Sequence, residues 1–110
     1  MASQAPLGEF EVMVLLAVLQ LRENAFGSAI RDEIERRSGR VVSRGSVYIT
    51  LDRLEEKGLL GSKLADASDS RGGRPKRFFR VTPAGLKGAK HSIGMLARMQ
   101  EGLEPVLGEF

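Results

Sequence analysis

The sequence predicts a mainly α-helical fold with one small antiparallel β-hairpin. Apolar residues recur at helical spacing in three successive segments and again near the C-terminus, which indicates four amphipathic helices. Two short segments on either side of a turn-rich stretch read as strands, and this pattern is typical of a hairpin. The 110 residues are 42% hydrophobic and 28% charged, which suits one soluble domain with a single core.

Two helices are expected first, over residues 8–22 and about 27–37. The apolar run of the first helix, VMVLLAVL, is far shorter than the roughly 20 residues that cross a membrane. The second helix should begin near Gly27 or Ser28, with Ser28 as the candidate N-cap, and bury Ile30 and Ile34. Its charged residues are expected to pair on solvent-facing sides at i,i+4 spacing, Asp32 with Arg36 and Glu33 with Arg37.

A third helix is expected to begin after Ser43, a good N-cap residue, and to end at Gly58. Val47, Leu51 and Leu54 fall within about 60° of one another around a helix with 3.6 residues per turn. They therefore predict the buried side of this helix. The opposite side carries Ile49, Asp52, Arg53 and Glu56.

The two strands of the hairpin are expected over residues 59–65 and 77–81, with Phe79 and Val81 on one face. Thr82 and Pro83 are typical of the N-cap and first position of a last helix, expected to run to about Glu104. The other elements already supply a core, so the apolar stripe of this helix predicts self-association. The predicted dimerisation residues are Leu86, Ala89, Ile93, Leu96 and Leu103.

The order helix, helix, helix, strand, strand, helix is that of a winged helix-turn-helix. We expect residues 1–82 to form this DNA-binding unit and residues 83–110 to form a C-terminal dimerisation helix and tail. In the winged-helix arrangement the third helix enters the major groove, and the hairpin, or wing, lies beside it against the phosphate backbone. Phosphate would repel Asp52, Glu55 and Glu56, so the N-terminal half of the third helix is expected nearer to DNA.

Two sets of side chains are candidates for contacting DNA. Hydroxyl groups can bind bases or phosphates, arginine can bind guanine through two hydrogen bonds, and an aliphatic group can contact a thymine methyl. Ile49 is the informative member, because a solvent-facing isoleucine otherwise lacks an explanation. The candidates on the third helix are Ser43, Ser46, Tyr48, Ile49, Thr50 and Arg53, and those on the wing are Arg71, Arg74, Lys76 and Arg77.

Both sets also have explanations that need no DNA. The outer side of the third helix could be an ordinary solvated face on which Arg53 pairs with Glu56. The ring of Tyr48 could fill a gap in the packing and expose only its hydroxyl. The wing could be a mobile tip that serves solubility, or its cations could neutralise nearby acids such as Asp66 and Asp69.

The run SRGSVYITLDRLEEKGLL, followed by GGRPKRFFRVTPAGL, resembles the PadR family of bacterial transcriptional regulators. The resemblance covers roughly residues 7–104 and implies a cytoplasmic, homodimeric DNA-binding regulator, most often a repressor, whose last helix pairs the subunits. Family sequences often have proline after the capping serine, whereas this chain has Arg44, a further candidate phosphate contact. Some members bind aromatic effectors through aromatic residues, but this chain has no Trp and only Tyr48 as Tyr, so its sequence does not support a small-molecule effector.

Other function classes find little support. The chain has no cysteine, which excludes disulfides, thiolate metal sites and cysteine catalysis and fits a reducing cytosol. His91 is the only histidine, and RGGRPK lacks the spacing of a nucleotide-binding loop, so we expect no enzyme, cofactor, metal or membrane association. The net charge of +3 permits an anionic partner, and the winged-helix order makes double-stranded DNA with a pseudo-palindromic operator the expected one. The alternatives are a winged-helix protein-interaction module without DNA binding and, with less support, an RNA-binding protein.

Overall fold

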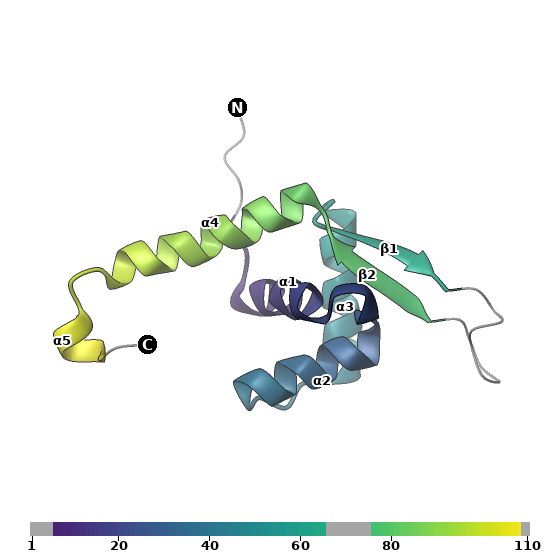
Figure 1. Cartoon of the computed structure of the whole chain (residues 1–110), viewed down its shortest axis with the longest axis horizontal. Helices are drawn as coiled ribbons and strands as arrows, with labels where there is room; N and C mark the ends of the chain where they lie inside the picture. The colour runs from purple at the N-terminus through teal and green to yellow at the C-terminus, as the bar shows by residue number, and fades with distance from the viewer. Residues whose placement is uncertain (1–5, 66–75, 109–110) are drawn as a thin grey trace.

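The computed structural model describes residues 6–65 and 76–108 and contains the expected order of elements (Figure 1). It is mainly helical, with one antiparallel sheet of two strands. The molecule is elongated, with extents of 55 × 37 × 21 Å. Its elements are α1 (Glu9–Leu21), the short 3-10 helix η1 (Arg22–Asn24), α2 (Gly27–Ser38), α3 (Arg44–Glu56), β1 (Leu60–Leu64), β2 (Arg77–Val81), α4 (Pro83–Gln100) and α5 (Glu104–Leu107).

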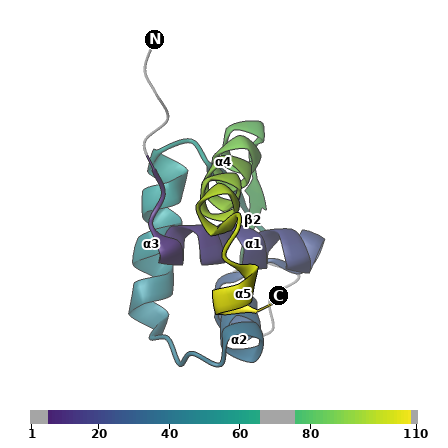
Figure 2. The same cartoon turned by 90° about the vertical axis from the view of Figure 1, so that its left-hand side faces the viewer.

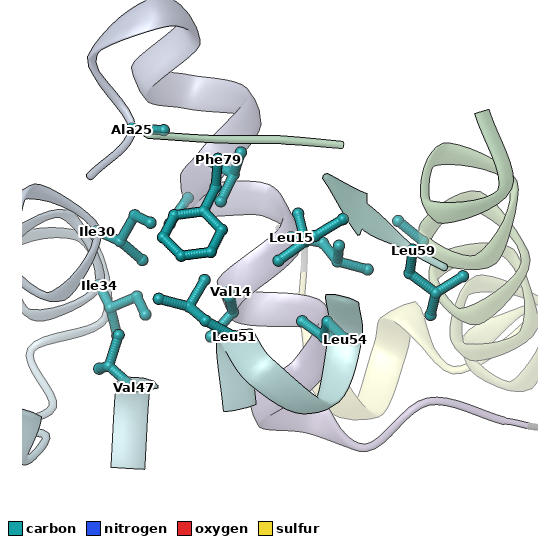
Figure 3. Close-up of a cluster of buried hydrophobic side chains, with 14 of the residues drawn as sticks. Val14, Leu15, Ala25, Ile30, Ile34, Val47, Leu51, Leu54, Leu59 and Phe79 are labelled. Atoms are coloured by element: carbon teal, nitrogen blue, oxygen red, sulfur yellow. The ribbon is translucent and has the colours of Figure 1, made fainter. Parts of the chain in front are cut away.

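One hydrophobic core joins the first three helices to the hairpin. α4 crosses on one side of α1 and α2 lies on the other, while α3 stands across them (Figures 1 and 2). The predicted buried side of α3 is confirmed, because Val47, Leu51 and Leu54 are inaccessible to solvent. Figure 3 shows these side chains meeting residues from α1, α2 and β2, including Leu15, Ile30 and Phe79. Burial of side chains of this size contributes about 1.5–3 kcal/mol each.

The predicted caps of α3 and α4 are present. The Ser43 hydroxyl accepts a hydrogen bond from the Ser46 amide at 3.0 Å, and the Thr82 hydroxyl accepts one from the Gly85 amide at 3.0 Å. The prediction that Ser28 caps α2 is wrong, because the helix begins at Gly27 and Phe26 occupies the capping position without a side-chain bond. α4 also ends earlier than predicted, at Gln100.

The hairpin is extended by a segment that the sequence analysis did not assign. β1 and β2 pair in antiparallel register, with Leu60 opposite Val81 and Ser62 opposite Phe79. On the other edge of β2, the Phe79 amide donates a hydrogen bond to the Ala25 carbonyl at 2.8 Å. A β-bridge also links Phe26 to Phe78, whose rings meet edge to face at 5.5 Å. The start of α2 is therefore tied directly to the wing.

Glu33 organises the charged side of α2 differently from the prediction. Its side chain is only 10% exposed, and it accepts hydrogen bonds from both Arg37 and Arg36. The pair with Arg37 was predicted, but Arg36 bonds to Glu33 at 2.9 Å instead of pairing with Asp32. Hydrogen bonding by Arg37, followed by that of Arg36, lowers the pKa of Glu33 below its ordinary value of 4.5.

The first half of α4 packs against the core of its own chain. Gly85, Gly88, Ala89 and Ser92 are its buried residues, and they face α1 and the hairpin. Ala89 is only 1% exposed. Ala89 was predicted to lie in the dimer interface, but the core of its own chain already covers it. At Gly85 a methyl group would overlap the Leu59 carbonyl, so this close approach requires glycine.

We predict that Gly85→Ala lowers the free energy of unfolding by about 1–3 kcal/mol, because the Leu59 main chain must move to make room. The matched control is Gly94→Ala on the same helix, where a methyl group would meet Arg98 only at an ordinary 3.5 Å. This control should gain up to about 1 kcal/mol from improved helix propensity. Urea unfolding of both variants at one protein concentration measures the difference, and equal stabilities would contradict the predicted overlap.

We also predict that the stabilising effect of Glu33 depends on pH. A carboxylate whose pKa is lowered by folding stabilises the protein above its unfolded pKa, and this effect is lost as the pH falls. The difference in free energy of unfolding between the wild type and Glu33→Gln should therefore shrink below about pH 4.5. Asp32→Asn, at the exposed neighbouring carboxylate, is the control and should change stability little. A Glu33→Gln difference that stays constant from neutral pH to pH 3 would show that the pairing is not stabilising.

Candidate nucleic-acid interface

The outer side of α3 presents polar and apolar side chains that the core does not use. Arg44, Ser46, Ile49 and Arg53 are exposed, and Ile49 is 61% accessible. The alternative in which Arg53 pairs with Glu56 is absent among the ion pairs of the described residues. The guanidinium of Arg53 is therefore available to a partner.

Thr50 is the one α3 candidate that lies on the wrong side of the helix. It is only 6% exposed, so it cannot reach a base edge, and its prediction as a groove-contacting residue is wrong. The physical reason is its position three residues after Val47 and four before Leu54, which places it beside the buried stripe.

The start of α3 carries the predicted Ser43 cap in an exposed first turn. The Ser43 hydroxyl caps the Ser46 amide and donates a hydrogen bond to the Ser46 hydroxyl at 2.8 Å. Arg44 and Gly45 follow in the exposed first turn. The unpaired amides of a first helical turn attract negative charge, so this end of α3 is the end suited to phosphate.

Tyr48 lies against the start of α2. A methyl group on Gly27 would overlap the phenol ring and hydroxyl of Tyr48, so glycine at this position makes room for the ring. The alternative in which the ring fills a gap and exposes only its hydroxyl is met in part, because the ring packs beside Gly27 but the hydroxyl lies there too and Tyr48 is 42% exposed. No local pattern indicates this contact, because Gly27 and Tyr48 are 21 residues apart in the sequence.

Two cations at the start of β2, Lys76 and Arg77, have partners within the chain. The Lys76 ammonium lies 4.1 Å from the centre of the Phe26 ring, an arrangement in which the ring's electrons attract the cation. The Arg77 guanidinium donates hydrogen bonds to Glu55 at 2.7 Å and to Ser62 at 2.9 Å. Neutralisation of nearby acids, the alternative considered for the wing, thus applies to Arg77, with Glu55 as the acid.

The other wing candidates, Arg71 and Arg74, lie outside the described residues, as do Asp66 and Asp69. Within residues 6–65 and 76–108, no group of three His, Asp or Glu side chains could hold a metal ion. None of the helices described by the structure combines the length and apolar character that a membrane crossing requires.

A cleft of about 840 Å³ lies between the end of α1 and the hairpin, away from the exposed side of α3. Apolar side chains from both elements line it, including Val18 and Phe78, and Arg22, Lys63 and Arg80 stand among them. It is open to solvent, and the residues that line it include none of the candidate DNA contacts.

An apolar surface extends along α4 beyond the part that packs on the core. Leu96 and Met99 continue the side of the helix that is buried nearer its start. Leu86 and Ile93 lie beside that side, and Leu103 follows the end of α4. The predicted residues Leu86, Ile93, Leu96 and Leu103 are all exposed, together with Met99 on α4 and Leu16 and Leu19 on α1.

The arrangement of α3, the wing and α4 can now be compared with known proteins. A profile of the PadR-like family of transcriptional regulators matches residues 15–91, which is more than half of the chain. The chain belongs to the PadR-like family. A search of curated proteins returned no match.

Solved structures with this fold include several PadR-family regulators. The chain is 27% identical to a PadR family transcriptional regulator from Eggerthella lenta, with a TM-score of 0.66 over 93% of this chain and 88% of that one. It is 20% identical to a PadR-like transcriptional regulator from Bacillus cereus, with a TM-score of 0.71 over 92% of this chain and 93% of that one. A PadR family regulator from Clostridium difficile gives 24% identity and a TM-score of 0.67 over 88% of this chain and 98% of that one.

We predict that Gly27→Ala displaces Tyr48 from α2. The chain contains one tyrosine and no tryptophan, so intrinsic fluorescence reports on Tyr48 alone. The variant should show a changed emission intensity and stronger quenching by acrylamide, because the added methyl group pushes the ring into solvent. Gly45→Ala is the matched control, since a methyl group there meets no atom within 4 Å. Unchanged Tyr48 emission in Gly27→Ala would contradict the packing.

Proposed function

We propose that this PadR-like protein is a sequence-specific DNA-binding repressor that acts as a homodimer. The observation that carries the proposal is the exposed outer side of α3, with Ile49 and Arg53 open to solvent beside a basic wing. An isoleucine left in water at this position needs an explanation, and contact with a thymine methyl supplies one. No catalytic role is proposed for any residue.

Each exposed candidate has a role that its chemistry suits. Arg53 is placed to bind guanine through two hydrogen bonds, and Ile49 to contact a thymine methyl. Arg44, at the N-terminus of α3, would bind phosphate together with the helix amides. Further contacts to the DNA backbone would come from two hydroxyls, those of Ser46 and Tyr48. The wing would add its cations, Lys76, Arg71 and Arg74.

The exposed apolar surface of α4 supports the homodimer. Leu96 and Met99 project beyond the part of the helix that the chain's own core covers. A second copy would bury this surface, so residues 83–110 would serve as the dimerisation segment. A two-fold axis between the subunits would present two α3 helices to successive major grooves, which requires half-sites about 34 Å apart in a pseudo-palindromic operator.

The central test is selection of bound fragments from the source genome, followed by titration of the best fragment at several salt concentrations. Specific binding should weaken linearly with the logarithm of salt concentration. A protein that selects no sequence, or binds without salt dependence, would contradict the proposal and leave the protein-interaction alternative. Transcription from the selected promoter in the presence of the protein then distinguishes repression from activation.

We predict different effects for the two α3 arginines. Arg53→Ala should weaken binding to the preferred fragment by about 1–3 kcal/mol and relax selectivity at one base pair. Arg44→Ala should weaken binding to all fragments alike and reduce the salt slope by about one. Lys90→Ala on α4 is the control for the loss of one positive charge outside the interface. Equal behaviour of the Arg53 and Arg44 variants would contradict the assigned roles.

We predict that Leu96→Glu prevents dimerisation. A charge buried in an apolar interface without a partner costs several kcal/mol, so the dimer dissociation constant should rise by about 100-fold or more. The side chain is exposed in the single chain, so the variant should still fold. Sedimentation velocity measures the effect, with Lys87→Glu, at an exposed residue on the side of α4 opposite Leu96, as the control. Unchanged association of Leu96→Glu would place the interface elsewhere.

A further inference from the structure

Three elements meet in a polar cluster on the half of the paired strands that lies farther from the connection to α3. Arg77 on β2 donates from Nη2 to Glu55 Oε1 on α3 at 2.7 Å and from Nε to the Ser62 hydroxyl on β1 at 2.9 Å. The Ser62 hydroxyl donates to the second oxygen of Glu55 at 2.6 Å. Asp52, one turn earlier on α3, lies 3.9 Å from the Arg77 guanidinium. The three side chains thus close a ring of hydrogen bonds between α3 and both strands.

We propose that Arg77 is a positioning residue that holds the wing at a set angle to the recognition helix α3, with Glu55 as its anchor. This inference rests on the proposed DNA binding and assigns Arg77 a role other than the phosphate contact that its place in a basic run suggests. It also gives Glu55, which phosphate alone would repel, a favourable role in DNA binding.

The contacts of Arg77 leave it poorly suited to bind phosphate. Its Nη2 and Nε groups already donate to Glu55 and Ser62, and its side chain is 46% exposed. The guanidinium carbon also lies 5.5 Å from the centre of the Phe79 ring, which belongs to the buried core. Moving to a phosphate would break these contacts and leave the Glu55 carboxylate without its cation, close to DNA. A pair with phosphate would also be charge-assisted, so the paired state is favoured because leaving it strands the Glu55 carboxylate and breaks the Ser62 contact as well.

The place of the cluster along the hairpin explains how it would set the angle of the wing. At one end, the hairpin is joined to α3 through Gly58 and is held by Thr82, which donates to the Gly58 carbonyl at 2.7 Å. At the other end, Arg77 pairs in register with Leu64, the last residue of β1. The cluster therefore ties α3 to the hairpin far from the connection between them, where it limits rotation of the wing most effectively.

In the same cluster, the positive charge of Arg77 offsets two negative charges beside the proposed DNA surface. Glu55 and Asp52 would each repel a phosphate, and Arg77 lies close to both. Removing the charge of Glu55 would therefore tighten DNA binding if repulsion alone mattered. It would weaken binding if Glu55 acts mainly by holding the wing, so the sign of the effect separates the two explanations.

The first test measures affinity and salt slope for the selected DNA fragment with Arg77→Ala and Glu55→Gln. We expect each variant to bind about tenfold more weakly, the effect of losing about 1.4 kcal/mol. The salt slope of Arg77→Ala should stay that of the wild type, and the double variant should bind no more weakly than either single variant. A direct phosphate contact would instead lower the slope by about one, and Glu55→Gln would then bind as well as the wild type or better. That combination would overturn the proposal.

The second test uses the free protein and does not depend on DNA. The Ala65 amide donates to the Lys76 carbonyl at 2.7 Å, one step beyond the Leu64–Arg77 pair, and its hydrogen exchange reports on that end of the hairpin. Exchange should be about tenfold faster in Arg77→Ala and in Glu55→Gln, with no further increase in the double variant. Lys63→Ala, which removes an exposed cation from β1, is the control and should exchange like the wild type.

The two tests separate the failure of this inference from the failure of the proposed function. Faster exchange in the variants of a protein that binds no DNA would leave the positioning contact standing and refute the function. Unchanged exchange in a protein that does bind DNA would refute the positioning role and leave the function standing.

Discussion

Burial of Val47, Leu51 and Leu54 is the constraint on which the rest of the arrangement depends. These side chains lock α3 against α1 and α2, and each contributes about 1.5–3 kcal/mol by leaving water. A helix held by one side presents the opposite side at a defined orientation. The exposure of Ile49 and Arg53 is therefore a direct consequence of the core, and a rotation of α3 that hid them would expose its leucines.

The wing is attached to this core by contacts of a different kind. Phe79 buries its ring among the helices, whereas Ala25 and Phe26 bond to the free edge of β2 and Arg77 joins α3 through Glu55. Backbone and charged contacts depend more on distance and angle than apolar burial does. The wing thus combines a firm apolar base with polar contacts that define its direction, which suits the proposed contact of the hairpin with a phosphate backbone.

α4 links the DNA-binding unit to the proposed dimer through one continuous helix. Its first half is packed closely enough to require glycine at Gly85, and its second half extends the same apolar side into solvent. Because the helix is unbroken from Pro83 to Gln100, the position of a partner on its second half would determine where the partner's α3 lies. The spacing of the operator half-sites would follow from this rigid connection.

The sequence by itself determined the four longer helices, the two strands, their order, the caps at Ser43 and Thr82 and the buried stripe of α3, but not η1 or α5. These features depend on residues within a few positions of one another, so periodicity and capping chemistry reveal them. Only the tertiary structure decided the partners of individual side chains. Thr50 lies at the edge of the buried stripe, where a small rotation of α3 about its axis decides whether a side chain is buried. Arg77 pairs with Glu55, which is 22 residues away in the sequence. Such choices depend on distances across the folded chain, which no local pattern records.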